Sequence, residues 1–415
     1  MIDISKVTKG EQYRALGLST FAFTVCFAVW TIFSVIGVKI QQELGLNDTQ
    51  LGLLLATPVL IGSISRLFLG ILAEKIGGRV LFPLQMLTTS VAVWMLTTVH
   101  TYEMLLVVAF CLGLAGGSFI IGVSYVSRWF PAKHQGSALG IFGVGNVGAA
   151  VTNFAAPFLV VGFGWEGTAK IYAVVLVITA ILFYILAKPD PQQSMNAPKV
   201  TIKEQLAPLK DIRVWRFSAY YFFSFGAFVA LASFLPRYYV GVYGLELTTA
   251  GVLAGLYSLP GSVFRALGGW MSDRKGARFV SYLTFLASMP ILFIMSYPGS
   301  HFIVNGMNGP IEFDIDVSLT LFVILSIGLG FLMSLGKAAV FKFIPLYYPN
   351  HVGSVGGLVG MIGGLGGFFL PISFGFLLDT TGIWTAPFML LFVLVGILTV
   401  WMHFAILSMD RSVSV

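Results

Sequence analysis

Apolar stretches, each about as long as a membrane is thick, recur along the whole chain and constrain the fold more than any other feature. A helix that crosses the hydrocarbon of a bilayer needs about 20 mostly apolar residues. Glycine and proline interrupt several stretches, and membrane helices tolerate both better than soluble helices do. We predict an all-α membrane protein with twelve transmembrane helices, at residues 17–39, 51–73, 80–99, 104–127, 137–161, 169–187, 215–239, 249–271, 279–297, 318–343, 353–378 and 384–407.

The composition excludes the water-soluble classes of protein. Hydrophobic residues make up 57% of the 415 residues and charged residues only 10%, whereas an average soluble chain has about 25% charged residues. The net charge of +7 predicts no nucleic-acid partner, because the basic residues lie between the apolar stretches and form no single patch. A soluble enzyme, a nucleic-acid binder and a disordered scaffold are therefore all excluded.

Neither the cysteines nor the histidines predict a reactive or metal-binding centre. The two cysteines, Cys26 and Cys111, lie in apolar stretches, and the five histidines are scattered without a metal-ligand spacing. No nucleophile with an acid–base partner occurs near a predicted membrane face. We predict no metal, no cofactor and no enzymatic activity.

The basic residues outside the predicted helices set the orientation in the membrane. If the N-terminus faces the cytoplasm, the inner segments hold most of them, and the outer segments hold only Lys39, Lys170 and Arg237. This asymmetry is the positive-inside pattern. It predicts that both termini are cytoplasmic.

The longest hydrophilic segment separates two sets of six predicted helices. It covers residues 188–214 and contains four prolines and five basic residues. We predict an N-terminal six-helix bundle at residues 1–187, a cytoplasmic linker at 188–214, and a C-terminal six-helix bundle at 215–415.

The two halves carry matching loops, which predict an internal repeat. Residues 66–79 read RLFLGILAEKIGGR, and residues 265–278 read RALGGWMSDRKGAR. Counted from the leading arginine, a glycine, a small residue, an acid, a base, a second glycine and a final arginine recur at the same offsets. Parallel six-helix repeats are a transporter architecture, in which the substrate binds at the midplane between the halves.

This loop resembles the signature of the Major Facilitator Superfamily, which implies that family's fold of two pseudo-symmetric six-helix halves. In that family the loop packs between helices of one half and helps to set the inward–outward switch. The alternative is a tight cytoplasmic turn with solvated charges. The gating residues that the resemblance implies are Gly70, Glu74, Arg79, Gly269, Asp273 and Arg278.

Three basic residues lie inside predicted helices, namely Arg66, Arg265 and Lys337, whereas all 17 acidic residues lie outside them or at their ends. A centred Arg or Lys costs roughly 2.5–3.5 kcal/mol on insertion scales. With no carboxylate at that depth, the simplest counter-ion is the cargo. Two arginines at matching positions suit a small anion, because a guanidinium stays charged and its planar fork matches an oxyanion. The alternative is that each arginine snorkels or bonds to helix carbonyls.

Glycines are concentrated in the fifth and eleventh predicted helices. Residues 143–148 match the letters of a dinucleotide-binding fingerprint, but no strand precedes them, so we reject that interpretation. Small residues allow helices to approach closely, which favours either plain packing or a rocking motion of one half against the other. The conformational candidates are Gly143, Gly145, Gly360, Gly363 and Gly364.

The same glycine segments resemble the signatures of the NarK-type nitrate/nitrite porters within the superfamily. Residues 116–119, 128–131 and 143–148 are similar to the first signature, and residues 356–371 to the second. The resemblance implies transport of nitrate, nitrite or both by alternating access, by a monomer in the lipid of the cell inner membrane. The substrate-binding residues it implies are Arg66, Arg265, Phe119, Asn146 and Tyr221, with Tyr220 as the adjacent alternative.

Anion uptake also requires coupling, because it costs about 2.3 kcal/mol per charge per 100 mV. Lys337 is the remaining titratable residue inside the predicted helices. We predict that it couples transport to protons, since a bound anion would draw a proton onto it. The glycine signatures are closer to the proton-linked type 1 branch, which favours nitrate/proton symport. Nitrate/nitrite exchange, a passive anion channel and a carrier of another small anion such as formate are the alternatives.

Overall fold

The computed structural model describes residues 7–130, 132–189, 191, 207–348 and 352–413. Eleven segments among these residues are helical, long and apolar enough to cross a membrane. One of them, Ala138–Leu186, is 49 residues long and contains a break at Gly164, where φ is 71°. It therefore corresponds to two spans, and the predicted twelve-helix membrane fold is confirmed.

The described residues of the first half form six spans, several of which consist of two or three helical pieces. Residues 190 and 192–206 of the predicted linker lie outside the described residues. In chain order the spans are α1 (Lys9–Trp30) with α2 (Phe33–Leu44), α3 (Asp48–Ile76), α4 (Gly78–Met95) with η2 (Leu96–Thr98), α5 (Tyr102–Leu112) with η3 (Gly113–Gly117) and α6 (Ser118–Ser127), α7 (Ala132–Gly143) with η4 (Val144–Val147) and the start of α8 (Gly148–Leu186), and the remainder of α8.

The described residues of the second half form six more spans after a short 3₁₀ turn, η5 (Ala207–Lys210). These spans are α10 (Ile212–Tyr221) with η6 (Phe222–Ala227) and α11 (Phe228–Tyr243), α12 (Leu247–Val263) with α13 (Arg265–Lys275), α14 (Ala277–Met295), α15 (Leu319–Tyr347), α16 (Val352–Gly364) with α17 (Gly366–Thr381), and α18 (Ala386–Val413).

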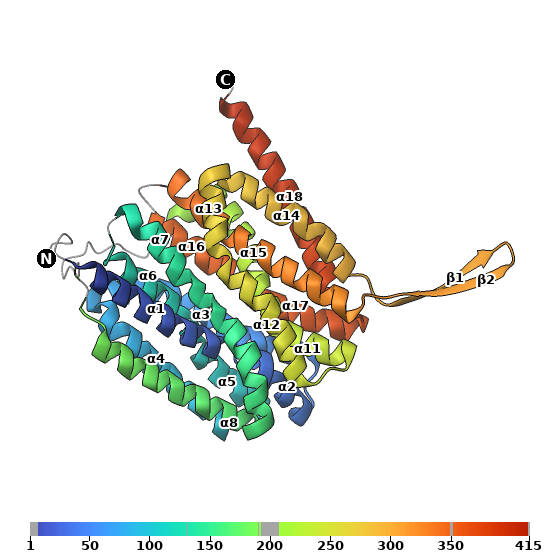
Figure 1. The fold of residues 1–415 in the computed structure, drawn as a ribbon, viewed down its shortest axis with the longest axis horizontal. Helices are drawn as coiled ribbons and strands as arrows, with labels where there is room; N and C mark the ends of the chain where they lie inside the picture. Colours follow the sequence, from blue (N-terminus) through green and yellow to red (C-terminus); the bar gives the residue numbers. More distant parts are fainter. Residues whose placement is uncertain (1–6, 131, 190, 192–206, 349–351, 414–415) are drawn as a thin grey trace.

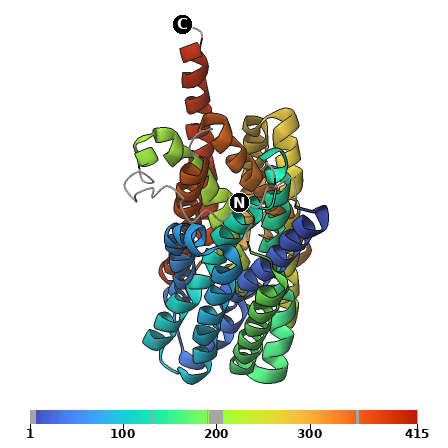
Figure 2. The ribbon, with the colours of Figure 1, turned by 90° about the vertical axis from the view of Figure 1, so that its left-hand side faces the viewer.

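A β-hairpin connects α14 to α15 and projects away from the helices (Figure 1). Its strands are β1 (Ser300–Gly306) and β2 (Gly309–Ile315), which pair antiparallel with Ser300 opposite Ile315. We call the end of the bundle that carries this hairpin the outer end, and the end that carries both chain termini the inner end. At the inner end α18 continues past the other helices (Figure 2).

Several spans change helix type along their length. Short 3₁₀ turns replace the α-helix at residues 113–117 and 144–147, which are rich in glycine, and a π-helical segment occupies Phe222–Ala227. Glycine is a poor α-helix former, and π-helical segments often mark functional sites.

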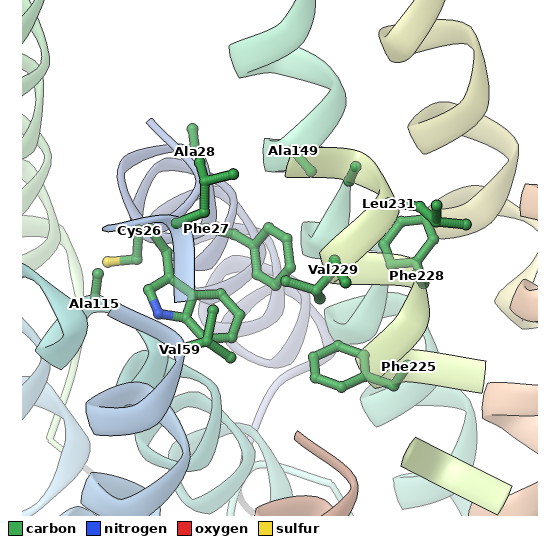
Figure 3. Close-up of a cluster of buried hydrophobic side chains, with 14 of the residues drawn as sticks. Cys26, Phe27, Ala28, Val59, Ala115, Ala149, Phe225, Phe228, Val229 and Leu231 are labelled. Atoms are coloured by element: carbon green, nitrogen blue, oxygen red, sulfur yellow. The ribbon is translucent and has the colours of Figure 1, made fainter. Parts of the chain in front are cut away.

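The hydrophobic core runs across both halves. Figure 3 shows Phe27 and Val59 of the first half close to Phe225 and Val229 of the second, and all four side chains are buried. A Cβ atom on Gly367 would lie 2.9 Å from a methyl of Val59 and 3.3 Å from one of Val229. The halves therefore meet in close packing at this level.

The outer ends of α3 and α17 approach each other at backbone distance. A Cβ atom on Gly52 would lie 2.3 Å from the carbonyl oxygen of Pro371, and one on Gly375 would lie 2.1 Å from that of Asp48. The Asp379 carboxylate also accepts hydrogen bonds from the backbone N–H groups of Asp48 and Thr49, at 3.1 and 2.7 Å, and from the Thr49 hydroxyl. Helix N-termini stabilise negative charge, so this contact closes the outer end electrostatically as well as sterically.

Three glycines nearer the inner end have open space beside them. Cβ atoms added to Gly140, Gly269 or Gly357 would meet no heavy atom within 4 Å. The two halves are therefore interlocked at the outer end and looser at the inner end.

This difference predicts unequal effects of two alanine substitutions in one span. We expect Gly375→Ala to lower the thermal unfolding midpoint of the purified protein, because overpacking of this kind costs about 1–3 kcal/mol. The matched change Gly357→Ala places its methyl in open space and should leave the midpoint close to that of the wild type. Equal midpoints for the two variants would contradict the interlocked outer end.

Candidate functional site

Arg66 reaches from α3 into the interface between the halves. Its side chain is buried, its Nη1 donates to the carbonyl oxygen of Gly360 at 3.1 Å, and its Nε donates to that of Gly116 at 3.4 Å. Both acceptors belong to glycine-rich segments, where no side chain shields the carbonyl. Arg66 therefore does make hydrogen bonds to helix carbonyls, which was the alternative to substrate binding in the sequence analysis. The Gly360 carbonyl comes from the opposite half, so the bond bridges the interface.

Three aromatic rings surround the Arg66 guanidinium. Its central carbon lies 5.9 Å from the ring centre of Trp30 and 5.6 Å from those of Phe119 and Phe225. Such distances allow cation–π attraction. The predicted aromatic Phe119 therefore does contact the predicted arginine.

Arg265 approaches the same interface from the second half. It begins α13 directly after the break between α12 and α13, and its guanidinium lies 5.6 Å from the ring centre of Phe341. A Cβ atom on Gly143, in the first half, would lie 3.4 Å from its Nη1. Both arginines therefore lie at the interface between the halves.

Tyr221 connects the surroundings of the two arginines. Its ring stacks on Phe225 at 4.9 Å and meets Phe341 edge to face at 5.0 Å. Phe225 contacts Arg66 and Phe341 contacts Arg265, so one aromatic series joins the two guanidinium groups. The alternative, Tyr220, packs instead on Phe217 and Phe285 within the second half. The contacts of Tyr221 and Tyr220 therefore differ, whereas the sequence left the choice between them open.

Three buried donors near the interface have no hydrogen-bond partner. They are Nη1 of Arg265, Nδ2 of Asn146 and the hydroxyl of Ser63. A buried polar group left unpaired costs about 1–3 kcal/mol. The Ser63 hydroxyl would lie 2.8 Å from a Cβ atom on Gly364, and Nη1 of Arg66 would lie 3.4 Å from the same point. Unpaired donors beside two guanidinium groups fit an anionic acceptor.

The predicted conformational glycines shape this site. Cβ atoms on Gly145 and Gly363 would collide with Phe23 and Tyr221, at 2.4 and 2.6 Å. Phe23 in turn lies 5.5 Å from Phe119, ring centre to ring centre. At these positions glycine makes room for the aromatic rings of the site.

Lys337 lies behind the aromatic series. It is fully buried, its Nζ donates to the carbonyl of Gly261 at 2.8 Å, and it lies 3.1 Å above the ring centre of Phe228. Phe225, at 5.9 Å, separates it from Arg66. Lys337 is thus one layer removed from the interface.

Among the residues that the structure describes, no carboxylate forms an ion pair with Arg66, Arg265 or Lys337. In the same residues, no group of three His, Cys, Asp or Glu side chains is placed to hold a metal ion.

The loop residues with predicted gating roles make contacts within their own halves. Asp273 pairs with Lys342, and Arg278 donates to the Tyr347 hydroxyl at 3.2 Å. Arg79 donates to the carbonyl of Tyr184 at 3.4 Å. Gly70 packs near Ile120, and Gly269 faces open space. The side chain of Glu74 lies outside what the structure describes.

Sequence reasoning missed Phe225, Phe341 and Ser63. A signal was present for both rings, since Phe225 follows Tyr221 by four positions and Phe341 follows Lys337 by four. Residues four apart share a helix face. With 37 phenylalanines in the chain, this spacing alone could not single them out.

Comparison with known proteins identifies similar membrane transporters. Residues 18–311 match the family model described as Major Facilitator Superfamily. The probable nitrate/nitrite antiporter NarK1 of Thermus thermophilus is 42% identical over 415 residues, covering 96% of this chain and 93% of the relative. The probable nitrate transporter NarT of Staphylococcus epidermidis is 31% identical, covering 88% and 89%. The nitrite extrusion protein of Bacillus subtilis is 28% identical, covering 95% of each chain.

A solved structure shares the fold at low sequence identity. It is a bacterial homolog of the human lysosomal transporter Spinster in an inward-facing and occupied conformation. Its TM-score is 0.73 at 16% identity, and the match covers 96% of this chain and 97% of that one.

The positions of the adjacent tyrosines predict different effects of removing their hydroxyl groups. We expect Tyr221→Phe to raise the half-saturating concentration of a small oxyanion such as nitrate roughly tenfold, because a hydrogen bond to a charged group contributes about 1.5–3 kcal/mol. Tyr220→Phe should have no such effect. Counterflow in proteoliposomes measures both, and similar values for the two variants would exclude a contact between the Tyr221 hydroxyl and the anion.

Proposed function

The chain belongs to the Major Facilitator Superfamily, and within it to the NarK-type nitrate/nitrite porters; on this premise we propose that it carries nitrate, and also nitrite, by alternating access. It is a multi-pass transporter of the bacterial inner membrane, and it is not an enzyme. The finer proposal is that Arg66 and Arg265 hold the anion between the halves.

The observation that carries this proposal is the pair of arginines at the interface. Each contributes a permanent charge from a different half, and Nη1 of Arg265 lacks a partner. A flat, weakly hydrated anion suits this setting, because aromatic rings can flank its faces while guanidinium groups and Asn146 donate to its oxygens. Phe119 and Tyr221 supply such rings beside Arg66 and between the two arginines.

The same pair suggests how binding drives the conformational change. Without an anion, the two guanidinium groups repel each other and oppose closure of the interface. A bound nitrate neutralises one charge and offers oxygens to both, which favours an occluded state. Loose packing of the inner-end glycines leaves room for the bundles at residues 1–187 and 215–415 to approach there. We assign Gly70, Glu74, Arg79, Gly269, Asp273 and Arg278 to the loops that limit this rocking motion.

We further propose nitrate/proton symport by a monomer in membrane lipid, with both termini cytoplasmic. Lys337 is buried behind Phe225 without an acidic partner among the described residues, so an anion at the arginines would favour its charged form. A second candidate is nitrate/nitrite exchange, which the similarity to the Thermus antiporter favours. Repulsion between the arginines would also hinder the empty carrier from changing conformation. A carrier that changes conformation only with an anion bound exchanges one anion for another.

The arginine assignment predicts the loss of transport when either charge is removed. We expect Arg66→Gln and Arg265→Gln each to weaken nitrate counterflow in proteoliposomes roughly tenfold to hundredfold, because charge-assisted hydrogen bonds are lost. Arg14→Gln, at an exposed position of α1, provides the matched loss of charge and should transport normally. Unlabelled nitrate, nitrite, formate and chloride as competitors define the cargo. Full transport by both site variants would refute the proposal.

The proton role predicts a separate effect at Lys337. We expect Lys337→Met to abolish the stimulation of nitrate uptake by an inward proton gradient while counterflow without a gradient persists. Lys337→Arg keeps a charge that cannot be released, so it should lose the stimulation as well. If nitrate uptake by the wild type does not respond to the proton gradient and requires nitrite inside the vesicles, the mechanism is nitrate/nitrite exchange and not symport.

A further inference from the structure

Trp30, the last residue of α1, is packed against the helix that carries Arg66. Its side chain is buried, and its indole Nε1 donates a hydrogen bond to the backbone carbonyl of Pro58 in α3 at 2.8 Å. A buried tryptophan usually finds such a partner for its N–H group. This bond fixes the position of the indole relative to α3.

Two glycines provide the space that the indole occupies. A Cβ atom on Gly62, in α3, would lie 2.7 Å from Nε1 of Trp30, and one on Gly116, in η3, would lie 2.7 Å from Cε2 of the same ring. Gly62 precedes Arg66 by four residues, about one helical turn. The Gly116 carbonyl accepts a hydrogen bond from Nε of Arg66 at 3.4 Å. The same two backbone segments therefore hold both the indole and the arginine.

The contacts of Arg66 fall into two groups. Its Nη1 donates to the carbonyl of Gly360, which belongs to the second half, at 3.1 Å. The carbonyl of Gly116 and the rings of Trp30 and Phe119 belong to the first half. A bond that spans the interface cannot restrain the guanidinium in a state in which the halves have moved apart. The contacts within the first half can persist, because their elements move together.

We propose that Trp30 is a positioning residue, which keeps Arg66 in place for the anion while the halves are apart. This inference rests on the proposed anion transport and on the role of Arg66 in it. An arginine side chain has many rotamers, and ordering it only on binding would weaken the affinity for the anion. An indole has only two side-chain torsions, and this one is tied to the backbone of the helix that carries Arg66. The open carrier therefore meets the anion with one guanidinium already in position.

The experiment measures nitrate counterflow in proteoliposomes for Trp30→Phe, which keeps an aromatic ring but removes the N–H group. The matched control is Trp165→Phe, because the buried Trp165 also donates from Nε1 at 2.8 Å, to the Glu43 carboxylate. Arg66→Gln and the double variant Trp30→Phe/Arg66→Gln complete a double-mutant cycle. The rise of the thermal unfolding midpoint with added nitrate measures binding without transport.

We expect Trp30→Phe to raise the half-saturating nitrate concentration roughly threefold to tenfold, which is the factor that a neutral hydrogen bond contributes. The maximal rate should change little, since the variant weakens binding to the open carrier. Trp165→Phe should leave the half-saturating concentration unchanged. In the Arg66→Gln background, Trp30→Phe should have little further effect, because Trp30 acts through Arg66.

Equal half-saturating concentrations for Trp30→Phe and Trp165→Phe would overturn the proposal, and so would additive losses in the cycle. Normal nitrate binding and transport by Arg66→Gln would instead refute the anion role of Arg66, and with it the function on which this inference rests. If Trp30→Phe does not fold, Gly62→Ala is the second variant, because the three atoms nearest to the added methyl all belong to Trp30. It should raise the half-saturating concentration in the same way, and an unchanged value would also overturn the proposal.

Discussion

Two permanent positive charges at the interface between two helical bundles, the buried Arg66 and the partly buried Arg265, are the constraint on which the rest of this structure depends. Lipid offers them no solvent, and among the described residues no acidic side chain neutralises them. The protein compensates in part with glycine carbonyls and aromatic rings around Arg66. Arg265 retains an unsatisfied donor. In the function that we propose, this unbalanced charge binds the anion and links binding to the separation of the halves.

Glycine serves this constraint in two ways. At the centre it removes side chains so that guanidinium and aromatic groups fit, as Gly363 does for Tyr221. At the outer end it lets α3 and α17 touch through their backbones, as Gly375 does against Asp48. These glycines therefore do more than let helices pack closely, which was one of the two interpretations of the sequence. Their crowding also differs between the two ends of the bundle.

The fold was predictable because its signals are large: apolar length, basic residues on one side, and a repeated loop. The position of Arg66 and Arg265 at the interface was also predictable, since charge inside a membrane span is rare and the repeat aligned them. The choice between Tyr221 and Tyr220 was not, because a π-helical segment begins directly after them. Lys337 lies behind Phe225, a position that depth along a helix cannot reveal. The β-hairpin between α14 and α15 was missed because it lies outside the membrane pattern.

The backbone contact at the outer end has a consequence for the pathway of the transport cycle. Packed side chains can move apart gradually by changing rotamers. A backbone carbonyl packed against a glycine can move only together with its helix. The Asp379 carboxylate, which bonds the first turn of α3, sits at the same place. Steric fit and hydrogen bonds must therefore be given up together, and we infer that the outer end switches between two states, closed and open. Partly open conformations of the outer end would therefore be short-lived. Other ions would rarely cross the membrane through such conformations.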